Sequence, residues 1–201
     1  MWIHNENLSE LGQQFFYGVG RKKSYRLAFP YLLKAAKLND PHCQNFVGYC
    51  YALGLGVEND SRLALFWYRY AASNDDKEGL GNLALRYEKE DGVKASPRKA
   101  FSLYKRGAEL GDAWAQCSLG VAYFEGLGTK RDPTEAIRWT RKAARQGDAR
   151  AQYNLGQAYL DGEGVPKNQK YARSWLSKAT KQGHKKGTEL LKSLEHPKRR
   201  R

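Results

Sequence analysis

Histidine and cysteine are among the side chains of this sequence that could bind a metal ion or act as a nucleophile. The histidines are His4, His42, His184 and His196, and the cysteines are Cys43, Cys50 and Cys117. None of the histidines stands at a helical spacing from another ligand that would suggest a metal cluster, and no pair of cysteines forms a C-x-x-C motif. We therefore predict no metal site and no cofactor, and we expect the cysteines to be small apolar residues in or near the core.

Glycine pairs separated by one residue are the second candidate for chemistry, because a glycine-rich loop can bind phosphate. The clearest pairs are Gly126 with Gly128 and Gly162 with Gly164. A phosphate-binding loop follows a strand, whereas these pairs lie between two segments with helical periodicity. They are therefore interpreted as helix ends. No base stands at a spacing from a nucleophile that is typical of a catalytic site, so we predict no catalytic residues and no enzyme activity.

The elements that carry these residues repeat with a 36-residue register that needs no gaps. One column reads Leu11, Val47, Leu83, Leu119 and Leu155, and the next reads Gly12, Gly48, Ala84, Gly120 and Gly156. A column in the second half reads Tyr31, Trp67, Leu103, Trp139 and Trp175. The repeats span residues 5–40, 41–76, 77–112, 113–148 and 149–184, so almost the whole chain is repeat.

Each repeat is predicted to be two helices joined by a short turn. Shared residues fall on one helical face in each half. The second helix begins after a capping residue at Asp60, Ser96, Asp132 or Asn168. Asp132 and Glu135 match a capping box. The first repeat has Ser24 at this position.

The combined pattern resembles the Sel1-like repeat, which is related to the tetratricopeptide repeat but has a longer period. Residues 113–148 and 149–184 resemble nearly complete members. The resemblance implies an all-α fold, a right-handed α-solenoid of five helix-turn-helix repeats, and an adaptor or scaffold role. The third repeat departs most, with Leu80 for glutamine, Ala84 and Glu90 for glycine, and Leu103 for tryptophan.

Residues 1–196 are predicted to form a single solenoid, in which residues 185–196 add a C-terminal capping helix. Leu190, Leu191 and Leu194 give this helix an apolar face, and Pro197 ends it. Residues 197–201 are then a basic tail that we expect to be disordered.

A partner protein is expected to bind on the face of each first helix that lies opposite the shared residues. In the family that the sequence resembles, this helix lines the concave surface. The stripe is rich in the aromatic and arginine side chains that dominate binding energies. The predicted binding residues are Tyr17, His42, Tyr49, Lys89, Trp114, Arg150 and Tyr153. Phe16, Phe46, Glu88 and Phe124 share the stripe, and for Phe46 and Phe124 packing against neighbouring helices is the alternative.

The charge of the chain is +14, with a +9 excess in residues 149–201. This charge suits an acidic partner protein, and nucleic acid or another polyanion bound by the C-terminal repeat and tail is the alternative. No window is apolar enough to span a membrane and no secretion signal opens the sequence, so a cytoplasmic location is expected. We also expect the protein to be a monomer.

A non-catalytic module that binds a partner protein is thus the leading prediction. It is expected to act as a bacterial adaptor or scaffold, or as an immunity protein that blocks a cognate toxin, a role that the resemblance includes.

Overall fold

The computed structural model describes residues 7–195, which form eleven α-helices and no strand. The helices are α1 (Leu8–Tyr17), α2 (Tyr25–Lys37), α3 (Pro41–Leu53), α4 (Ser61–Ser73), α5 (Lys77–Lys89), α6 (Pro97–Glu109), α7 (Ala113–Glu125), α8 (Pro133–Arg145), α9 (Ala149–Asp161), α10 (Gln169–Lys181) and α11 (Lys185–Glu195). The predicted all-α class is confirmed. His4, His196 and the predicted tail at 197–201 lie outside the described residues.

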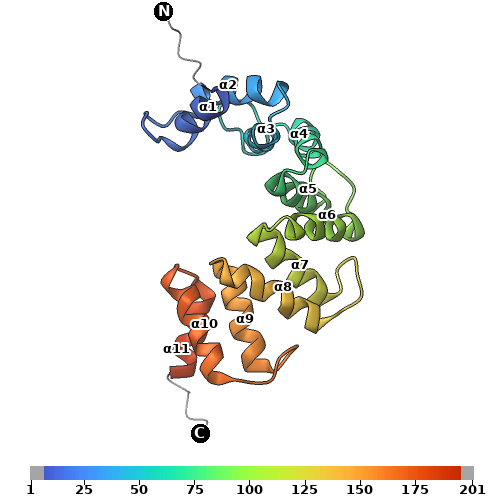
Figure 1. Ribbon diagram of the computed structural model, residues 1–201, viewed down its shortest axis with the longest axis vertical. Helices are drawn as coiled ribbons and strands as arrows, with labels where there is room; N and C mark the ends of the chain where they lie inside the picture. Colours follow the sequence, from blue (N-terminus) through green and yellow to red (C-terminus); the bar gives the residue numbers. More distant parts are fainter. Residues whose placement is uncertain (1–6, 196–201) are drawn as a thin grey trace, which may run out of the picture. The chain divides into compact units, whose positions relative to one another are not determined.

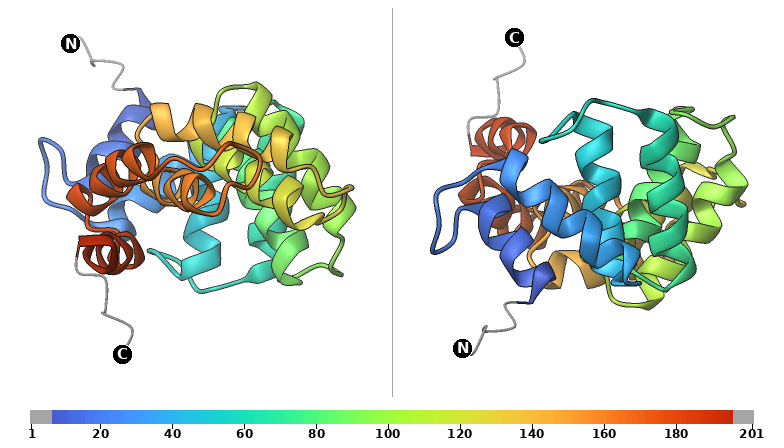
Figure 2. Two further views of the ribbon diagram at one scale, coloured as in Figure 1. Left: turned by 90° about the horizontal axis from the view of Figure 1, so that it is seen from below. Right: turned by 90° about the horizontal axis from the view of Figure 1, so that it is seen from above.

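The chain divides into two compact units within α6, after Leu103. Inside each unit, consecutive helices pack side by side (Figures 1 and 2). The odd-numbered helices α1 to α9 are the first helices of the repeats, and the even-numbered helices α2 to α10 are the second. First helices of successive repeats also contact each other, as when Cys43 Sγ of α3 meets Ser9 Oγ of α1 at 3.1 Å.

Each first helix after α1 begins at an aspartate that caps its free N–H groups. The Asp40 carboxylate accepts a hydrogen bond from the Cys43 N–H at 2.9 Å, and Asp148 accepts from Ala151 at 2.6 Å. The acidic side chain also interacts favourably with the positive end of the helix dipole.

The second helices are capped as predicted by Ser24, Asp60, Asp132 and Asn168. The predicted capping box of Asp132 and Glu135 is wrong, because only one of its two hydrogen bonds forms. Asp132 Oδ1 accepts from the Glu135 N–H at 3.0 Å. The Asp132 N–H donates to the Tyr123 carbonyl at 2.8 Å, and the Glu135 carboxylate binds Arg138 instead. The same bond recurs between the Asn168 N–H and the Tyr159 carbonyl. In both repeats a backbone carbonyl of the first helix therefore accepts the bond that the glutamate side chain of a capping box would accept.

The glycine pairs end the first helices and allow a close backbone approach. Gly162 caps α9 with φ at 74°. At Gly164 a Cβ would lie 2.3 Å from the Pro133 carbonyl oxygen at the start of α8. The interpretation of these glycines as structural is therefore supported by both backbone conformation and packing.

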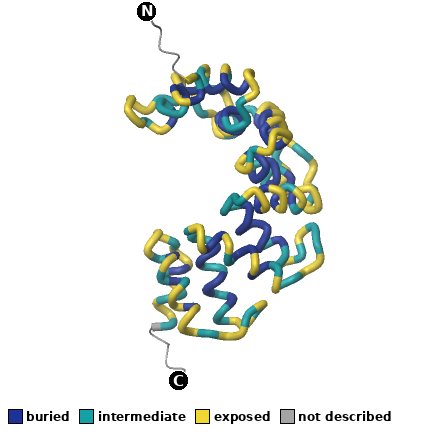
Figure 3. Tube along the Cα trace, viewed as in Figure 1, coloured by how far each residue is buried: buried dark blue, intermediate teal, exposed yellow. Residues whose placement is uncertain are grey.

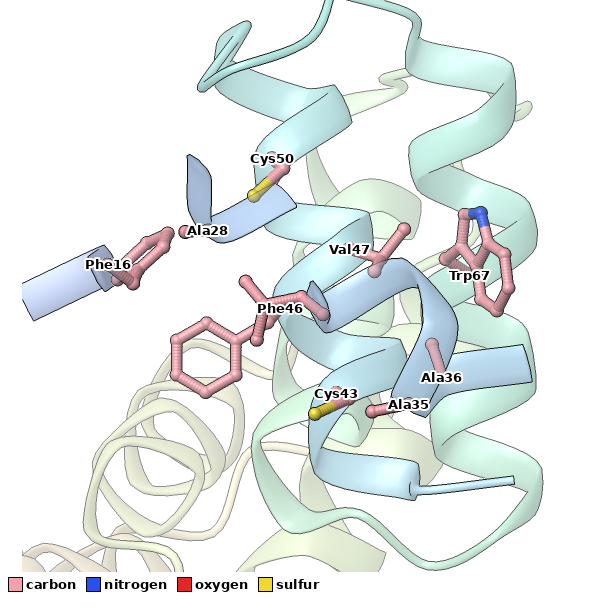
Figure 4. Close-up of a cluster of buried hydrophobic side chains, with 10 residues drawn as sticks. Phe16, Ala28, Ala35, Ala36, Cys43, Phe46, Val47, Cys50 and Trp67 are labelled. Carbon is pink, nitrogen blue, oxygen red and sulfur yellow. The ribbon is translucent and has the colours of Figure 1, made fainter. Parts of the chain in front are cut away.

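Buried residues lie mainly in the helices, whereas the residues of the loops are mostly exposed (Figure 3). In the unit before Leu103, Phe16, Phe46, Val47 and Trp67 belong to one buried cluster (Figure 4). In the other unit, Ile137, Leu155 and the alanines around them form a second cluster.

Buried glutamines join successive repeats. Gln152 of α9 donates to the Ala144 carbonyl of α8 at 3.2 Å and accepts from Gln182 at 3.0 Å. Gln44 and Gln116 make the same kind of bond to Ala36 and Ala108. The third repeat has Leu80 at this position, so it lacks the glutamine.

No helix within residues 7–195 has the length and apolar character needed to cross a bilayer.

Candidate protein-binding surface

All seven predicted binding residues lie on first helices, and the two units divide them into two sets. Tyr17, His42, Tyr49 and Lys89 belong to one unit, and Trp114, Arg150 and Tyr153 to the other. Each set is described within its own unit.

In the second unit Arg150 lies against Trp114. The guanidinium carbon of Arg150 is 5.9 Å from the centre of the Trp114 ring. Arg150 Nη2 donates to Ser118 Oγ at 2.9 Å and to the Trp114 carbonyl at 3.4 Å, and Nε contacts Cys117 Sγ at 3.1 Å. These bonds between α7 and α9 fix the orientation of a half-buried arginine.

Tyr153 extends this surface along α9, because it lies three residues after Arg150 on the same face. Its ring stacks on His184 with the centroids 4.6 Å apart and the planes 25° apart. His184 is itself fixed, since its Nδ1 accepts from the Gly187 N–H at 3.0 Å at the start of α11. We call Trp114, Arg150, Tyr153 and His184 the Trp114 patch.

In the first unit the stripe is partly core, so the packing alternative for Phe46 is confirmed and the same holds for Phe16. Phe16 and Phe46 are buried, and their rings meet edge to face at 5.0 Å. Tyr17 and Tyr49 remain 59% and 40% exposed above them. The reason is that α1 and α3 pack on each other as well as on their own second helices, so the face opposite the hairpin also buries side chains.

His42 joins this cluster at the start of α3. Its ring meets Phe46 edge to face at 4.8 Å, and Nδ1 lies 3.5 Å from the Asp76 carboxylate. The hydrogen bond to Asp76 is the main cause that raises the pKa of His42, against the opposing effect of burial; Glu78 and Asp40 raise it further. Tyr17, His42 and Tyr49 together are the Tyr49 patch.

Lys89 and Phe124 stand apart from these patches. Lys89 is exposed at the end of α5, and its ammonium lies 3.3 Å from the carboxylate of its neighbour Glu88. Phe124 is half-buried and carries Arg131 over its ring at 5.4 Å.

The cysteines lie in the core as expected. Cys43, Cys50 and Cys117 are free thiols with no measurable exposure, and burial raises the pKa of each to about 12. Between residues 7 and 195, no group of three or more His, Cys, Asp or Glu side chains is arranged to hold a metal ion.

A cavity of about 250 Å³ was missed by the sequence reasoning. It lies between α7, α8 and α9, beside Thr140. The available signal was the side chain at residue 140, which is short where the equivalent positions Leu32, Tyr68 and Leu176 are large.

Comparison with protein families gives five matches to one model, described as the Sel1 repeat, over residues 8–40, 41–76, 78–112, 115–148 and 149–184. No curated protein matches the sequence.

Solved structures share the fold. A Sel1 repeat protein from Oxalobacter formigenes is 27% identical with a TM-score of 0.84, over 93% of this chain and 74% of that one. A protective antigen of uropathogenic Escherichia coli with an SLR fold is 30% identical with a TM-score of 0.80, over 92% of this chain but only 39% of its own. An immunity protein from Pseudomonas aeruginosa is 19% identical with a TM-score of 0.63, over 93% of this chain and 70% of that one.

Proposed function

Because the chain belongs to the Sel1 repeat family, whose repeats form protein-interaction modules, we propose that it is a non-catalytic adaptor that binds a partner protein through the outward-facing side chains of its first helices. The observation that carries this proposal is the Trp114 patch. It combines a tryptophan, an arginine and a tyrosine on two adjacent helices, with the arginine held by three acceptors.

Fixed side chains favour binding because little conformational entropy is lost when a partner docks. Tryptophan, tyrosine and arginine are also the residue types that contribute most at protein interfaces. Arg150 Nη1 makes no hydrogen bond within the described residues, so it is left to bind an acceptor of the partner. The Tyr49 patch supplies a second surface of the same type, since Tyr17 and Tyr49 are exposed over a fixed aromatic base.

The proposal is tested by replacing Trp114 and Tyr153 with alanine in one variant. Tagged protein is used to recover partners from native lysate, with nuclease, at low and high salt. We expect retention of a stoichiometric partner to fall at least about tenfold, because tryptophan and tyrosine are enriched among the interface residues whose truncation costs about 2 kcal/mol or more.

The matched control is Tyr171→Ala, which removes an aromatic side chain that is 54% exposed on α10, away from the patch. It should leave retention unchanged, and circular dichroism should show that both variants stay folded. Equal retention by the double variant and the wild-type protein would place the interface elsewhere.

A finer version of this proposal makes the partner a toxin and the chain its immunity protein. The solved immunity protein shares the fold at 19% identity, which supports the scaffold and says nothing of the binding residues. Co-expression with a toxin encoded beside this chain tests it: growth should be restored by the wild-type protein and not by the double variant.

The second candidate is a polyanion such as nucleic acid. One observation favours it: exposed cationic side chains gather on the last repeat and α11. They are Lys167, Lys170, Arg173, Lys178, Lys181, Lys185, Lys186 and Lys192. A cationic surface of this kind attracts phosphates without reading sequence.

A further inference from the structure

The cavity beside Thr140 lies where one repeat departs from a packing pattern that three other repeats share. In those three repeats a glycine of the first helix packs against a large side chain from the second helix, whereas α5 has Ala84 at this position. A Cβ at Gly12 would lie 2.7 Å from Leu32, one at Gly48 would lie 2.8 Å from Tyr68, and one at Gly156 would lie 2.7 Å from Leu176. At Gly120 that partner is the shorter Thr140, whose Oγ1 would lie 2.4 Å from a Cβ, so the glycine is covered but the space beyond the threonine is not.

The space is not refilled by neighbouring side chains, so a cavity of about 250 Å³ remains between α7, α8 and α9. This volume is below the ~300–1,000 Å³ of pockets for drug-sized ligands, and it suits a single side chain.

The lining is apolar inside and acidic at its opening. Ile137 and Ala158 are buried in the wall, whereas Glu125 and Asp161 are exposed at the opening. Glu163 lies there too and forms an ion pair with Arg131.

The charge of the opening is opposite to that of the chain. Three carboxylates line the cavity, and no lysine, arginine or histidine lines it, in a chain of net charge +14. Glu125 and Asp161 form no ion pair with any residue that the structure describes. A cation that enters would therefore meet two carboxylates without an ion-pair partner, beside the third carboxylate that Arg131 already binds.

We propose that the Thr140 cavity binds an arginine side chain of the partner protein. This inference rests on the proposed function, since it assigns a feature of the partner. The apolar wall would contact the arginine stem, and the carboxylates would face the guanidinium.

Arginine fits better than lysine because of the number of acceptors. The side-chain amides of Asn154 and Gln157 line the cavity together with the carboxylates. A guanidinium has five N–H donors in a fixed plane, so it can bond several acceptors at once, whereas an ammonium is a compact point charge.

The cavity is tested without the partner, by titrating N-acetyl-arginine amide into ¹⁵N-labelled protein. The control probe is N-acetyl-citrulline amide, which has nearly the same shape and no charge. We expect saturable shifts of the Val121 and Ala158 amides with a dissociation constant on the order of 1 mM, and at least about tenfold weaker binding of citrulline.

Two variants separate shape from charge. Thr140→Leu introduces the side chain that the chain already uses at residues 32 and 176, so it should fill the cavity, abolish the shifts and leave the protein folded. Glu125→Gln with Asp161→Asn should keep the cavity and reduce binding of the arginine probe about tenfold, toward that of citrulline. Urea unfolding of each variant checks that the fold survives.

Three results would overturn the proposal: equal binding of the two probes, shifts that persist in Thr140→Leu, or no saturable shift near the cavity. If Thr140→Leu retains the partner and the Trp114 and Tyr153 double variant loses it, the arginine site is rejected and the proposed function stands. If Thr140→Leu loses the partner and the double variant retains it, the Trp114 patch is rejected and the cavity stands.

Discussion

A single residue of the third repeat, Glu90, occupies a backbone conformation that other repeats give to glycine. It caps α5 with φ at 58°, where Gly126 and Gly162 cap α7 and α9. A side chain is disfavoured in this left-handed region by roughly 1–2 kcal/mol. Glycine removes this penalty but gains entropy in the unfolded chain.

We therefore expect Glu90→Gly to raise the free energy of unfolding by about 0.5–1 kcal/mol, as measured by urea denaturation. The reciprocal variant Gly126→Glu is the control and should lower it by about 1–2 kcal/mol. A loss of stability in Glu90→Gly would mean that the carboxylate makes a contribution larger than the backbone penalty.

His42 is the second residue with a measurable signature. Its pKa is raised in the folded protein by the hydrogen bond to Asp76. A raised folded pKa stabilises the protein fully below the unfolded value of about 6.5, and this stabilisation is lost as the pH rises through the folded pKa.

The stability advantage of the wild-type protein over His42→Gln should therefore be larger at about pH 5.5 than at about pH 9. Chemical denaturation at both values measures it, and His184→Gln, on the other unit, is the comparison. A constant difference between wild-type and His42→Gln would show that the ion pair with Asp76 does not form in solution.

At the level of elements, buried glutamines connect one repeat to the next. Gln152 is 4% exposed and bonds both Ala144 of α8 and Gln182 after α10. Replacing it with alanine leaves buried polar groups without partners, which costs about 1–3 kcal/mol for each such group.

We expect Gln152→Ala to lower the free energy of unfolding by about 2 kcal/mol, whereas Gln169→Ala, at an exposed position of α10, should change it by less than about 0.5 kcal/mol. Thermal and urea unfolding both report this difference. Equal effects of the two variants would show that the glutamine bonds add nothing to stability.

The helices and their caps were predictable because they depend on local residues. Asp60, Asp132 and Asn168 cap the second helices where the sequence places them. The binding face was harder to predict, because one helix packs on three neighbours. Phe16 and Phe46 lie opposite the shared face and are still buried between α1 and α3. The periodicity of apolar residues shows which face of a single helix is buried, whereas the burial of Phe16 and Phe46 depends on contact with a helix of the neighbouring repeat.

At the scale of the whole molecule, the distribution of charge distinguishes the two candidate functions. The C-terminal segment 149–201 carries 13 basic and four acidic residues. If this segment binds a polyanion, the logarithm of the affinity must fall linearly with the logarithm of salt concentration, since bound counterions are released.

Fluorescence anisotropy with labelled single-stranded DNA between about 50 and 200 mM salt measures the slope. A protein that contacts six or more phosphates would lose about a thousandfold in affinity over this range. For the proposed adaptor we expect no saturable binding of the DNA even at the lowest salt. Saturable binding at about 50 mM salt that then weakens with this steep slope would favour the second candidate.

The buried cysteines have a practical consequence for observing motion in this protein. A thiol whose pKa is about 12 and which has no exposure reacts with an alkylating reagent only when the surrounding helices separate. Cys43 and Cys50 lie in one unit and Cys117 in the other. The alkylation rate of each native thiol therefore measures how often the helices around it separate in its own unit, and no probe needs to be introduced.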